Sequence, residues 1–157
     1  MIITQSIYTQ LLLLPEVPPE TGGLLGSHRG IIDTICIDIS HTITEQAMYI
    51  PNIQYLNQQL INWHNSATNW EGLFHSHLAN SPELSQDDKL YIQTIMQAMP
   101  PHINKLYFPI ILPGKKMTSF QAIRQPGNYV SIVKDNIKIV KNGGNDHDKQ
   151  HQNINCN

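Results

Sequence analysis

The sequence predicts a single α/β domain in which a mixed β-sheet is flanked by helices. Its length of 157 residues is typical of one domain. Apolar residues recur at helical spacing in three segments, and other segments carry the β-branched, partly alternating runs of strands. The predicted order is a helix, a hairpin, a helix, a strand, a third helix and then several strands, which is typical of a mixed sheet with helices packed against it.

The N-terminal part predicts a helix followed by a β-hairpin. The apolar residues that predict the helix recur at helical spacing up to Pro15, which ends it: Ile3, Ile7, Leu11 and Leu14. Residues 21–40 have a β-rich pattern that is interrupted by a turn at 27–30. This segment therefore predicts two strands joined by a tight turn.

Two further helices are predicted on either side of a short buried strand. Pro51 predicts the start of the second helix, because proline suits the first helical turn. The apolar stripe of this helix consists of Ile53, Leu56, Leu60 and Trp63. Residues 70–74 form an apolar run that ends at His75 and predicts a strand. The third helix is predicted to begin at Ser85 and to end before Pro100.

The remaining apolar segments predict strands, followed by a polar tail. The expected strands are residues 106–112, 117–123, 129–133 and 137–140. We expect the last of them to pair with the strand that precedes it. The predicted domain thus covers residues 1–140. Residues 141–157 have too few apolar side chains to form a core, so we expect this tail to be disordered.

Charge and composition exclude several classes of function. The net charge is −2 without a basic block, which argues against a nucleic-acid partner. The apolar run from Leu11 to Leu14 is too short to span a membrane and lacks the basic residues of a signal peptide, so we expect a cytoplasmic protein. Cys36 is expected to be buried, and the second cysteine, Cys156, is in the tail. Low cysteine use fits a reducing compartment.

The segment HSHLANSPELSQDD carries the strongest chemical signal. His75 and His77 are two residues apart at the end of a predicted strand, so both imidazoles project from one face, whereas Ser76 projects from the other. Asp88 follows in the first turn of the predicted third helix. Three protein ligands that leave a fourth position open are typical of a catalytic zinc site. The sequence therefore predicts Zn²⁺ bound by His75, His77 and Asp88.

Each half of this pattern also has a purely structural interpretation. Ser85 and Asp88 match the capping box of a helix N-terminus, which needs no metal. A His-x-His pair also occurs in ordinary strands. The neighbouring Asp87 is a second candidate for the carboxylate ligand.

The same residues resemble the JAMM signature of the JAB/MPN metalloprotease family, which reads H-[ST]-H-x7-S-x2-D. The matching residues are His75, Ser76, His77, Ser85 and Asp88. A second segment, PETGGLLG, resembles the family's glutamate-bearing segment and places Glu20 at the glutamate position. The resemblance covers the chain from about Met1 to Lys134. One departure is Leu78, which stands where the family usually has proline directly after the second histidine.

This resemblance implies a fold, a reaction and roles for individual residues. The fold would have a cytidine-deaminase-like architecture, and the short loops resemble the compact prokaryotic type of the family. Glu20 would be the general base of a zinc-dependent metallopeptidase or isopeptidase, and Ser85 would stabilise the oxyanion. The substrate would be an amide bond after the C-terminal tail of a ubiquitin-like or sulfur-carrier-like protein, or of a small peptide. A catalytically silent binding module of MPN type and a zinc hydrolase of a non-peptide small molecule are the alternatives.

Overall fold

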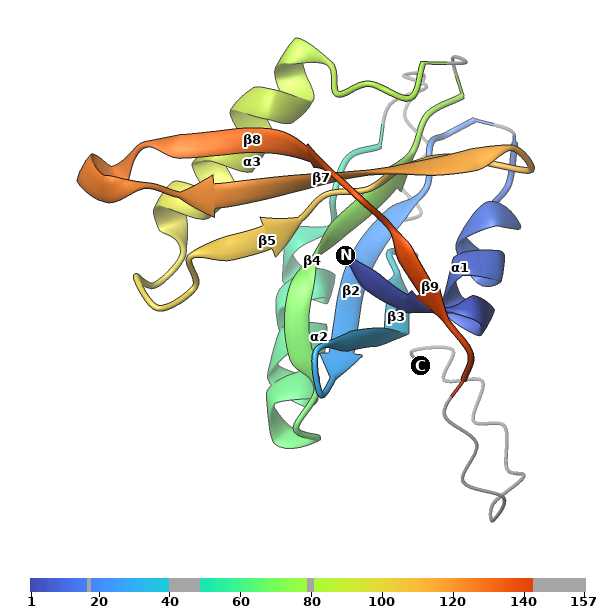
Figure 1. Cartoon of the computed structure of the whole chain (residues 1–157), viewed down its shortest axis with the longest axis horizontal. Coiled ribbons are helices and arrows are strands. Elements are labelled where there is room, and N and C mark those ends of the chain that lie inside the picture. The colour runs from blue at the N-terminus through green and yellow to red at the C-terminus, as the bar shows by residue number, and fades with distance from the viewer. Residues whose placement is uncertain (17, 40–48, 79–80, 143–157) are drawn as a thin grey trace.

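The chain forms a mixed α/β domain. The computed structural model describes residues 1–16, 18–39, 49–78 and 81–142, and within them it contains three α-helices and a large mixed sheet (Figure 1). The elements are β1 Ile2–Thr4, α1 Gln5–Leu12, β2 Gly22–His28, β3 Ile31–Ile37, α2 Ile53–Asn65, β4 Asn69–Ser76, α3 Gln86–Ala98, β5 Lys105–Tyr107, β6 Ile110–Leu112, β7 Lys116–Arg124, a 3₁₀ turn Pro126–Asn128, β8 Val130–Asp135 and β9 Lys138–Val140.

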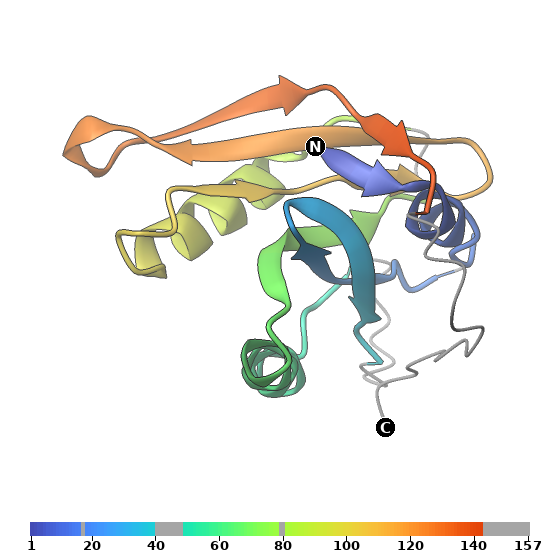
Figure 2. The same cartoon turned by 60° about the horizontal axis from the view of Figure 1, so that its bottom comes forward.

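Both faces of the sheet centre are covered by helices. Leu24 and Leu25 are neighbours in β2 and project from opposite faces. Leu24 packs in a cluster with residues of α2 and α3, whereas Leu25 packs in a second cluster with residues of α1. Leu73 and Phe74 of β4 divide in the same way between the two clusters. Figure 2 shows α1 well separated from α2 and α3. The strands β2 and β4 are therefore the buried centre of the domain.

The topology brings the start of β2 beside the end of β4. The sheet order is β5-β7-β6-β4-β2-β3-β1-β9, and β8 pairs with β7. The strand β4 is antiparallel to β2, with Gly22 opposite His75, and parallel to β6, with His75 opposite Ile110. The residues just before β2 and just after β4 consequently lie at the same end of the sheet.

The predicted hairpin and the second and third helices are confirmed, with small shifts. Arg29 and Gly30 both have positive φ angles, of 53° and 76°, as a two-residue turn with the twist of a hairpin requires. Helix α2 begins after Pro51, because the Asn52 side chain accepts a hydrogen bond from the Tyr55 N–H and caps the helix. Helix α3 ends at Ala98.

The N-terminal helix is shorter than predicted, because a strand precedes it. Ile3 lies in β1 and pairs with Ile32 of β3. The Thr4 hydroxyl then accepts a hydrogen bond from the Ile7 N–H at 3.4 Å and caps α1. The apolar side chains of Ile3 and Ile7 are both buried, so helical spacing alone did not separate the strand from the helix.

Two predictions about the C-terminal strands were wrong. The segment 106–112 is not one strand: it divides into β5 and β6, and Pro109 between them cannot donate a backbone hydrogen bond. The strand β9 does not pair with β8 but lies parallel to β1. This pairing follows from contacts of Met1, whose amino group binds the Asp135 carboxylate and the Asn136 carbonyl. These contacts direct the chain from β8 towards β1.

The buried position predicted for Cys36 is confirmed. Cys156 and the tail from residue 143 lie outside the described residues. Among the described residues, no helix is long and apolar enough to cross a membrane.

Candidate metal centre

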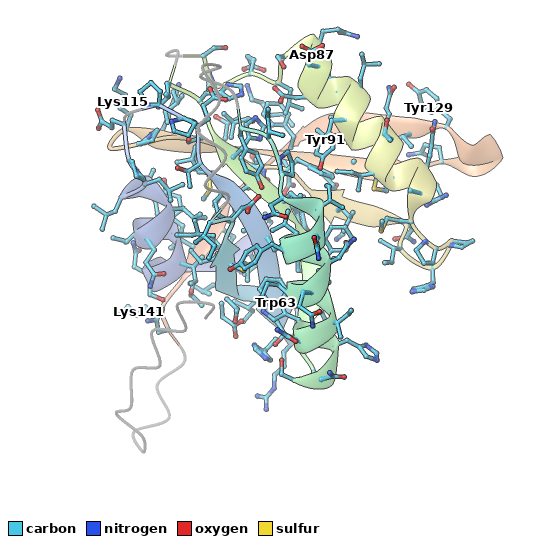
Figure 3. The ribbon with its side chains drawn as sticks, turned by 180° about the vertical axis from the view of Figure 1, so that it is seen from behind. Trp63, Asp87, Tyr91, Lys115, Tyr129 and Lys141 are labelled. Atoms are coloured by element: carbon cyan, nitrogen blue, oxygen red, sulfur yellow. The ribbon has the colours of Figure 1, made fainter. Side chains whose placement is uncertain are left out.

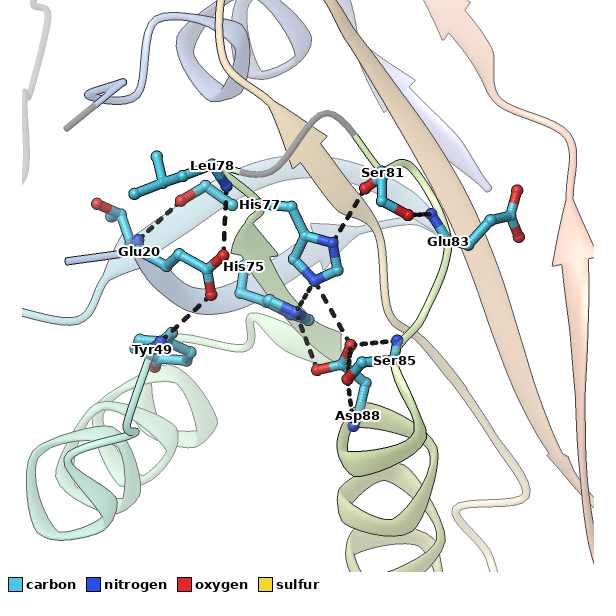
Figure 4. A network of polar contacts seen from close by, with 11 residues as sticks. Glu20, Tyr49, His75, His77, Leu78, Ser81, Glu83, Ser85 and Asp88 are labelled. Carbon is cyan, nitrogen blue, oxygen red and sulfur yellow. Dashed lines mark hydrogen bonds and ion pairs between the residues drawn. The ribbon is translucent and has the colours of Figure 1, made fainter. Parts of the chain in front are cut away.

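The two histidines leave the end of β4 on one face, where the neighbouring strand fixes their backbone. The His75 N–H donates to the Pro109 carbonyl at 3.3 Å, and the His77 N–H donates to the Ile111 carbonyl at 2.9 Å. Their side chains approach each other, with 2.9 Å between the two Nε2 atoms (Figure 4). The predicted i, i+2 arrangement is thus present.

Ser76 projects from the opposite face and joins the two sequence motifs. Its side chain is fully buried. The Ser76 hydroxyl accepts a hydrogen bond from the Thr21 N–H at 2.8 Å, and the Ser76 N–H donates to the Thr21 carbonyl at 2.7 Å. Because Thr21 directly follows Glu20, these two bonds hold the glutamate-bearing segment beside the histidines.

The predicted capping box and the predicted ligand position coincide at Asp88. The Ser85 hydroxyl accepts the Asp88 N–H at 3.1 Å, and the Ser85 N–H donates to Asp88 Oδ2 at 2.7 Å. The Ser85 hydroxyl also donates to Oδ2 at 2.7 Å. The carboxylate is therefore fixed at the helix start with its remaining lone pairs towards the histidines. Asp87 is exposed and lies at the outer end of α3 (Figure 3), so Asp88 is the carboxylate of this cluster.

The distances between the three side chains fit a tetrahedral metal site. His75 Nε2 lies 3.1 Å from Asp88 Oδ1, and His77 Nε2 lies 3.4 Å from Asp88 Oδ2. Tetrahedral bonds of about 2.0–2.1 Å separate neighbouring ligand atoms by about 3.3–3.4 Å. Together with the 2.9 Å between the imidazoles, the cluster needs only a small opening to hold an ion. One ligand atom from each of the three residues lies within 4.8 Å of the other two.

The tautomer of His77 suits a ligand. Its Nδ1 lies 3.0 Å from the Ser81 carbonyl oxygen, an acceptor that requires the proton to be on Nδ1. Nε2 is thereby left with a lone pair directed at the cluster. The three side chains are 17%, 12% and 19% exposed for His75, His77 and Asp88. The site is thus partly buried and still reachable from solvent.

Charge coupling within the cluster favours the ionised carboxylate. The hydrogen bond to Asp88 raises the pKa of His77, burial opposes this, and the negative charge of Glu20 adds to the increase. Burial raises the pKa of Asp88, but hydrogen bonds from His75, His77 and Ser85 outweigh it and keep this pKa far below its usual range. Without a metal the cluster therefore attracts a proton. To a metal cation it offers a negative charge and imidazole nitrogens as ligands.

Glu20 lies beside the cluster, with each carboxylate oxygen held by one backbone N–H (Figure 4). The Leu78 N–H donates to Oε1 at 3.3 Å, and the Tyr49 N–H donates to Oε2 at 3.4 Å. A proline in place of Leu78 would have no N–H to donate. The departure from the family pattern at this position consequently gives Glu20 a hydrogen bond.

Two residues that adjoin the site, Tyr49 and Asp38, were not indicated by any motif in the sequence. The Tyr49 ring stacks on the His75 ring, with 6.4 Å between the centroids and 18° between the planes. The Tyr49 hydroxyl donates to Asp38 Oδ2 at 2.9 Å. Gly22 allows this arrangement, since an added Cβ would lie only 2.2 Å from the Tyr49 ring. The Gly22-Gly23 pair was the one available sign that another group approaches β2 closely.

Two solved structures are similar to this chain in fold. The solution structure of protein DSY2949 from Desulfitobacterium hafniense has a TM-score of 0.63 at 18% identity, and the match covers 96% of this chain and 100% of that one. The solution structure of a protein from Salinibacter ruber has a TM-score of 0.53 at 16% identity, with 89% and 92% covered. At these identities the likeness concerns the fold alone. No protein-family model and no curated protein matches the sequence.

Proposed function

We propose that this chain is a zinc-dependent metallopeptidase or isopeptidase of JAB/MPN type. The observation that carries the proposal is the convergence of His75, His77 and Asp88, from a strand end and a helix start, next to the Glu20 carboxylate. Residues far apart in the sequence thus come together, which supports the arrangement that the resemblance implies. A helix on one face of the mixed sheet and two on the other also support a cytidine-deaminase-like architecture.

The donor set is compatible with zinc. Two imidazole nitrogens and one carboxylate oxygen are ligands of a catalytic zinc, which keeps its fourth position open. When bound, zinc supplies a Lewis acid and lowers the pKa of water to about 7. The His77–Ser81 contact at 3.0 Å and the Ser85–Asp88 contacts at 2.7 Å are the outer hydrogen bonds that orient ligands of this kind.

We propose that Glu20 transfers the proton during amide hydrolysis. Its carboxylate is held by two backbone N–H groups and adjoins His77. In amide hydrolysis this carboxylate would take a proton from the attacking water and deliver it to the leaving amine nitrogen. Because its contacts are long, at 3.3 and 3.4 Å, they restrain the carboxylate while leaving it free to accept that proton.

Ser85 has a double role in this proposal. Its hydroxyl proton is directed at Asp88 Oδ2 in the structure. Stabilisation of an oxyanion requires this proton to turn towards the substrate. The Ser85 N–H can continue to hold Oδ2 at 2.7 Å when the hydroxyl turns, so Asp88 keeps its orientation during that change.

The proposed substrate is an amide bond after the C-terminal tail of a ubiquitin-like or sulfur-carrier-like protein, or of a small peptide. A partly exposed cluster at the end of a central strand suits an extended, glycine-rich segment, because such a tail has no bulky side chains. The protein or peptide substrate is the expected partner, in the cytoplasm.

The experiment combines zinc analysis with cleavage of an aminocoumarin amide of a glycine-rich peptide. We expect one zinc per chain and amide cleavage in the unaltered protein. Glu20→Gln should retain zinc and lose activity, since the amide cannot accept the proton. The matched control is Glu83→Gln, which alters an exposed loop carboxylate paired with Lys134 and should retain activity.

The outcomes separate the proposal from its alternatives. Full activity of Glu20→Gln contradicts the mechanism. Bound zinc without any amide cleavage favours a hydrolase of a non-peptide small molecule. Absence of zinc from the purified, zinc-supplemented protein contradicts the proposal and favours the silent binding module.

A further inference from the structure

Tyr49 contacts both halves of the candidate site. Its ring lies against the ring of His75, one of the proposed ligands, at 18° between the planes. Its backbone N–H donates to Glu20, the proposed base, at 3.4 Å. Tyr49 belongs neither to the strand that carries the histidine nor to the segment that carries the glutamate (Figure 4). Tyr49 is therefore placed to fix the position of His75 relative to Glu20.

Asp38 holds Tyr49 in this position. Its side chain is buried, and its Oδ2 atom accepts the Tyr49 hydroxyl at 2.9 Å and the Asn52 N–H at 2.7 Å. The Asp38 N–H donates to the Gly22 carbonyl at 2.8 Å, which fastens it to the start of β2. Hydrogen bonds to an ionised acceptor are stronger than neutral ones. The Asp38 carboxylate thus ties the segment 49–52 to the strand next to the site.

The Tyr49 hydroxyl remains a donor. Its proton is directed at Asp38 Oδ2, 2.9 Å away, and a phenol is protonated at neutral pH. The ring also occupies space that only glycine leaves free at position 22. The position of the ring is accordingly determined from two sides.

We propose that Tyr49, held by Asp38, is a positioning residue of this site. Its ring sets the orientation of the His75 imidazole, and its N–H sets the position of the Glu20 carboxylate. This inference rests on the proposed function, because it concerns the same zinc ligand and the same base. A merely structural tie between the helix start and the sheet would stabilise the fold without changing turnover or metal affinity.

The test uses two substitutions at Tyr49 and a control in α2. Tyr49→Phe removes the bond to Asp38 but keeps the ring, whereas Tyr49→Leu also removes the ring. Tyr55→Phe is the matched control: its hydroxyl contacts Cys36 Sγ at 3.5 Å and lies outside the proposed site. The measurements are kcat and KM on the aminocoumarin amide, zinc affinity by competition with a chelating dye, and circular dichroism to verify folding.

Losing a residue that orients a metal ligand typically costs about 10–100-fold in metal affinity or activity. We expect Tyr49→Phe to lower kcat by about tenfold with little change in KM, and Tyr49→Leu to weaken zinc binding by at least that factor. Tyr55→Phe should match the unaltered protein. The inference is overturned if folded Tyr49→Leu retains both kcat and zinc affinity within twofold, or if Tyr55→Phe has equal effects. An unaltered protein that binds no zinc overturns the proposed function as well, which distinguishes the two failures.

Discussion

Replacing Leu78 by proline removes one hydrogen bond from the proposed base. The Leu78 N–H donates to Glu20 Oε1 at 3.3 Å, and proline has no N–H. A hydrogen bond to a charged group contributes about 1.5–3 kcal/mol. Since this bond is longer than the usual distance of about 2.9–3.0 Å, we use the lower limit. A change of about 1.5 kcal/mol in the activation free energy corresponds to roughly a tenfold change in rate.

The matched variant is Leu78→Ala, which shortens the side chain but keeps the N–H. We expect Leu78→Pro to lower kcat on the aminocoumarin amide by about tenfold relative to Leu78→Ala, at equal zinc content. Equal zinc content matters because the adjacent residue, His77, is a proposed ligand. Values of kcat that agree within twofold between the two variants would show that the Leu78–Glu20 contact makes no difference to turnover, contrary to this prediction.

Three further predictions concern the cluster. Asp88→Asn should abolish stoichiometric zinc binding whereas Asp87→Asn should not, although each removes one charge from the first turn of α3; equal zinc loss in elemental analysis would contradict this. Ser85→Ala should cost about 1 kcal/mol of stability by removing the helix cap, which lowers Tm by about 2–4 °C, and an unchanged thermal melt would argue against the capping contact. Zinc competes with a proton for His77 Nε2, and the pKa of His77 is raised, so calorimetry should give weaker zinc binding as the pH falls through that pKa; affinity independent of pH would be inconsistent with His77 as a ligand.

The parts of the site that are close in sequence were predictable. The i, i+2 spacing of His75 and His77 fixes their common face as soon as the segment is a strand. The capping pattern of Ser85 and Asp88 fixes the start of α3. Both patterns depend on local geometry, and both are present in the structure. The sequence alone did not decide between the capping and ligand interpretations, and in the structure Asp88 completes the capping box and also lies beside both histidines.

Contacts that depend on tertiary structure were not predictable. The two bonds between Ser76 and Thr21 join segments that are 55 residues apart, and no local pattern indicates such a pairing. The same holds for Tyr49, because no local pattern in the sequence indicates its contacts with His75 and Asp38.

The misassigned pairing of β9 has the same origin. Its short apolar pattern fits a strand beside β8 as well as one beside β1. The contacts of the Met1 amino group with Asp135 and Asn136 select β1. Spacing predicts which residues form a strand, whereas pairing depends on contacts between distant segments.

The most direct test of the proposed zinc site is X-ray absorption spectroscopy at the zinc edge of the zinc-loaded protein. Zinc held by His75, His77 and Asp88 should have about four nitrogen and oxygen ligands at about 2.0–2.1 Å, two of them imidazoles, and should lose one imidazole in His75→Ala. A sulfur ligand at about 2.3 Å, or an imidazole count unaffected by His75→Ala, would place the zinc elsewhere and contradict the proposed site.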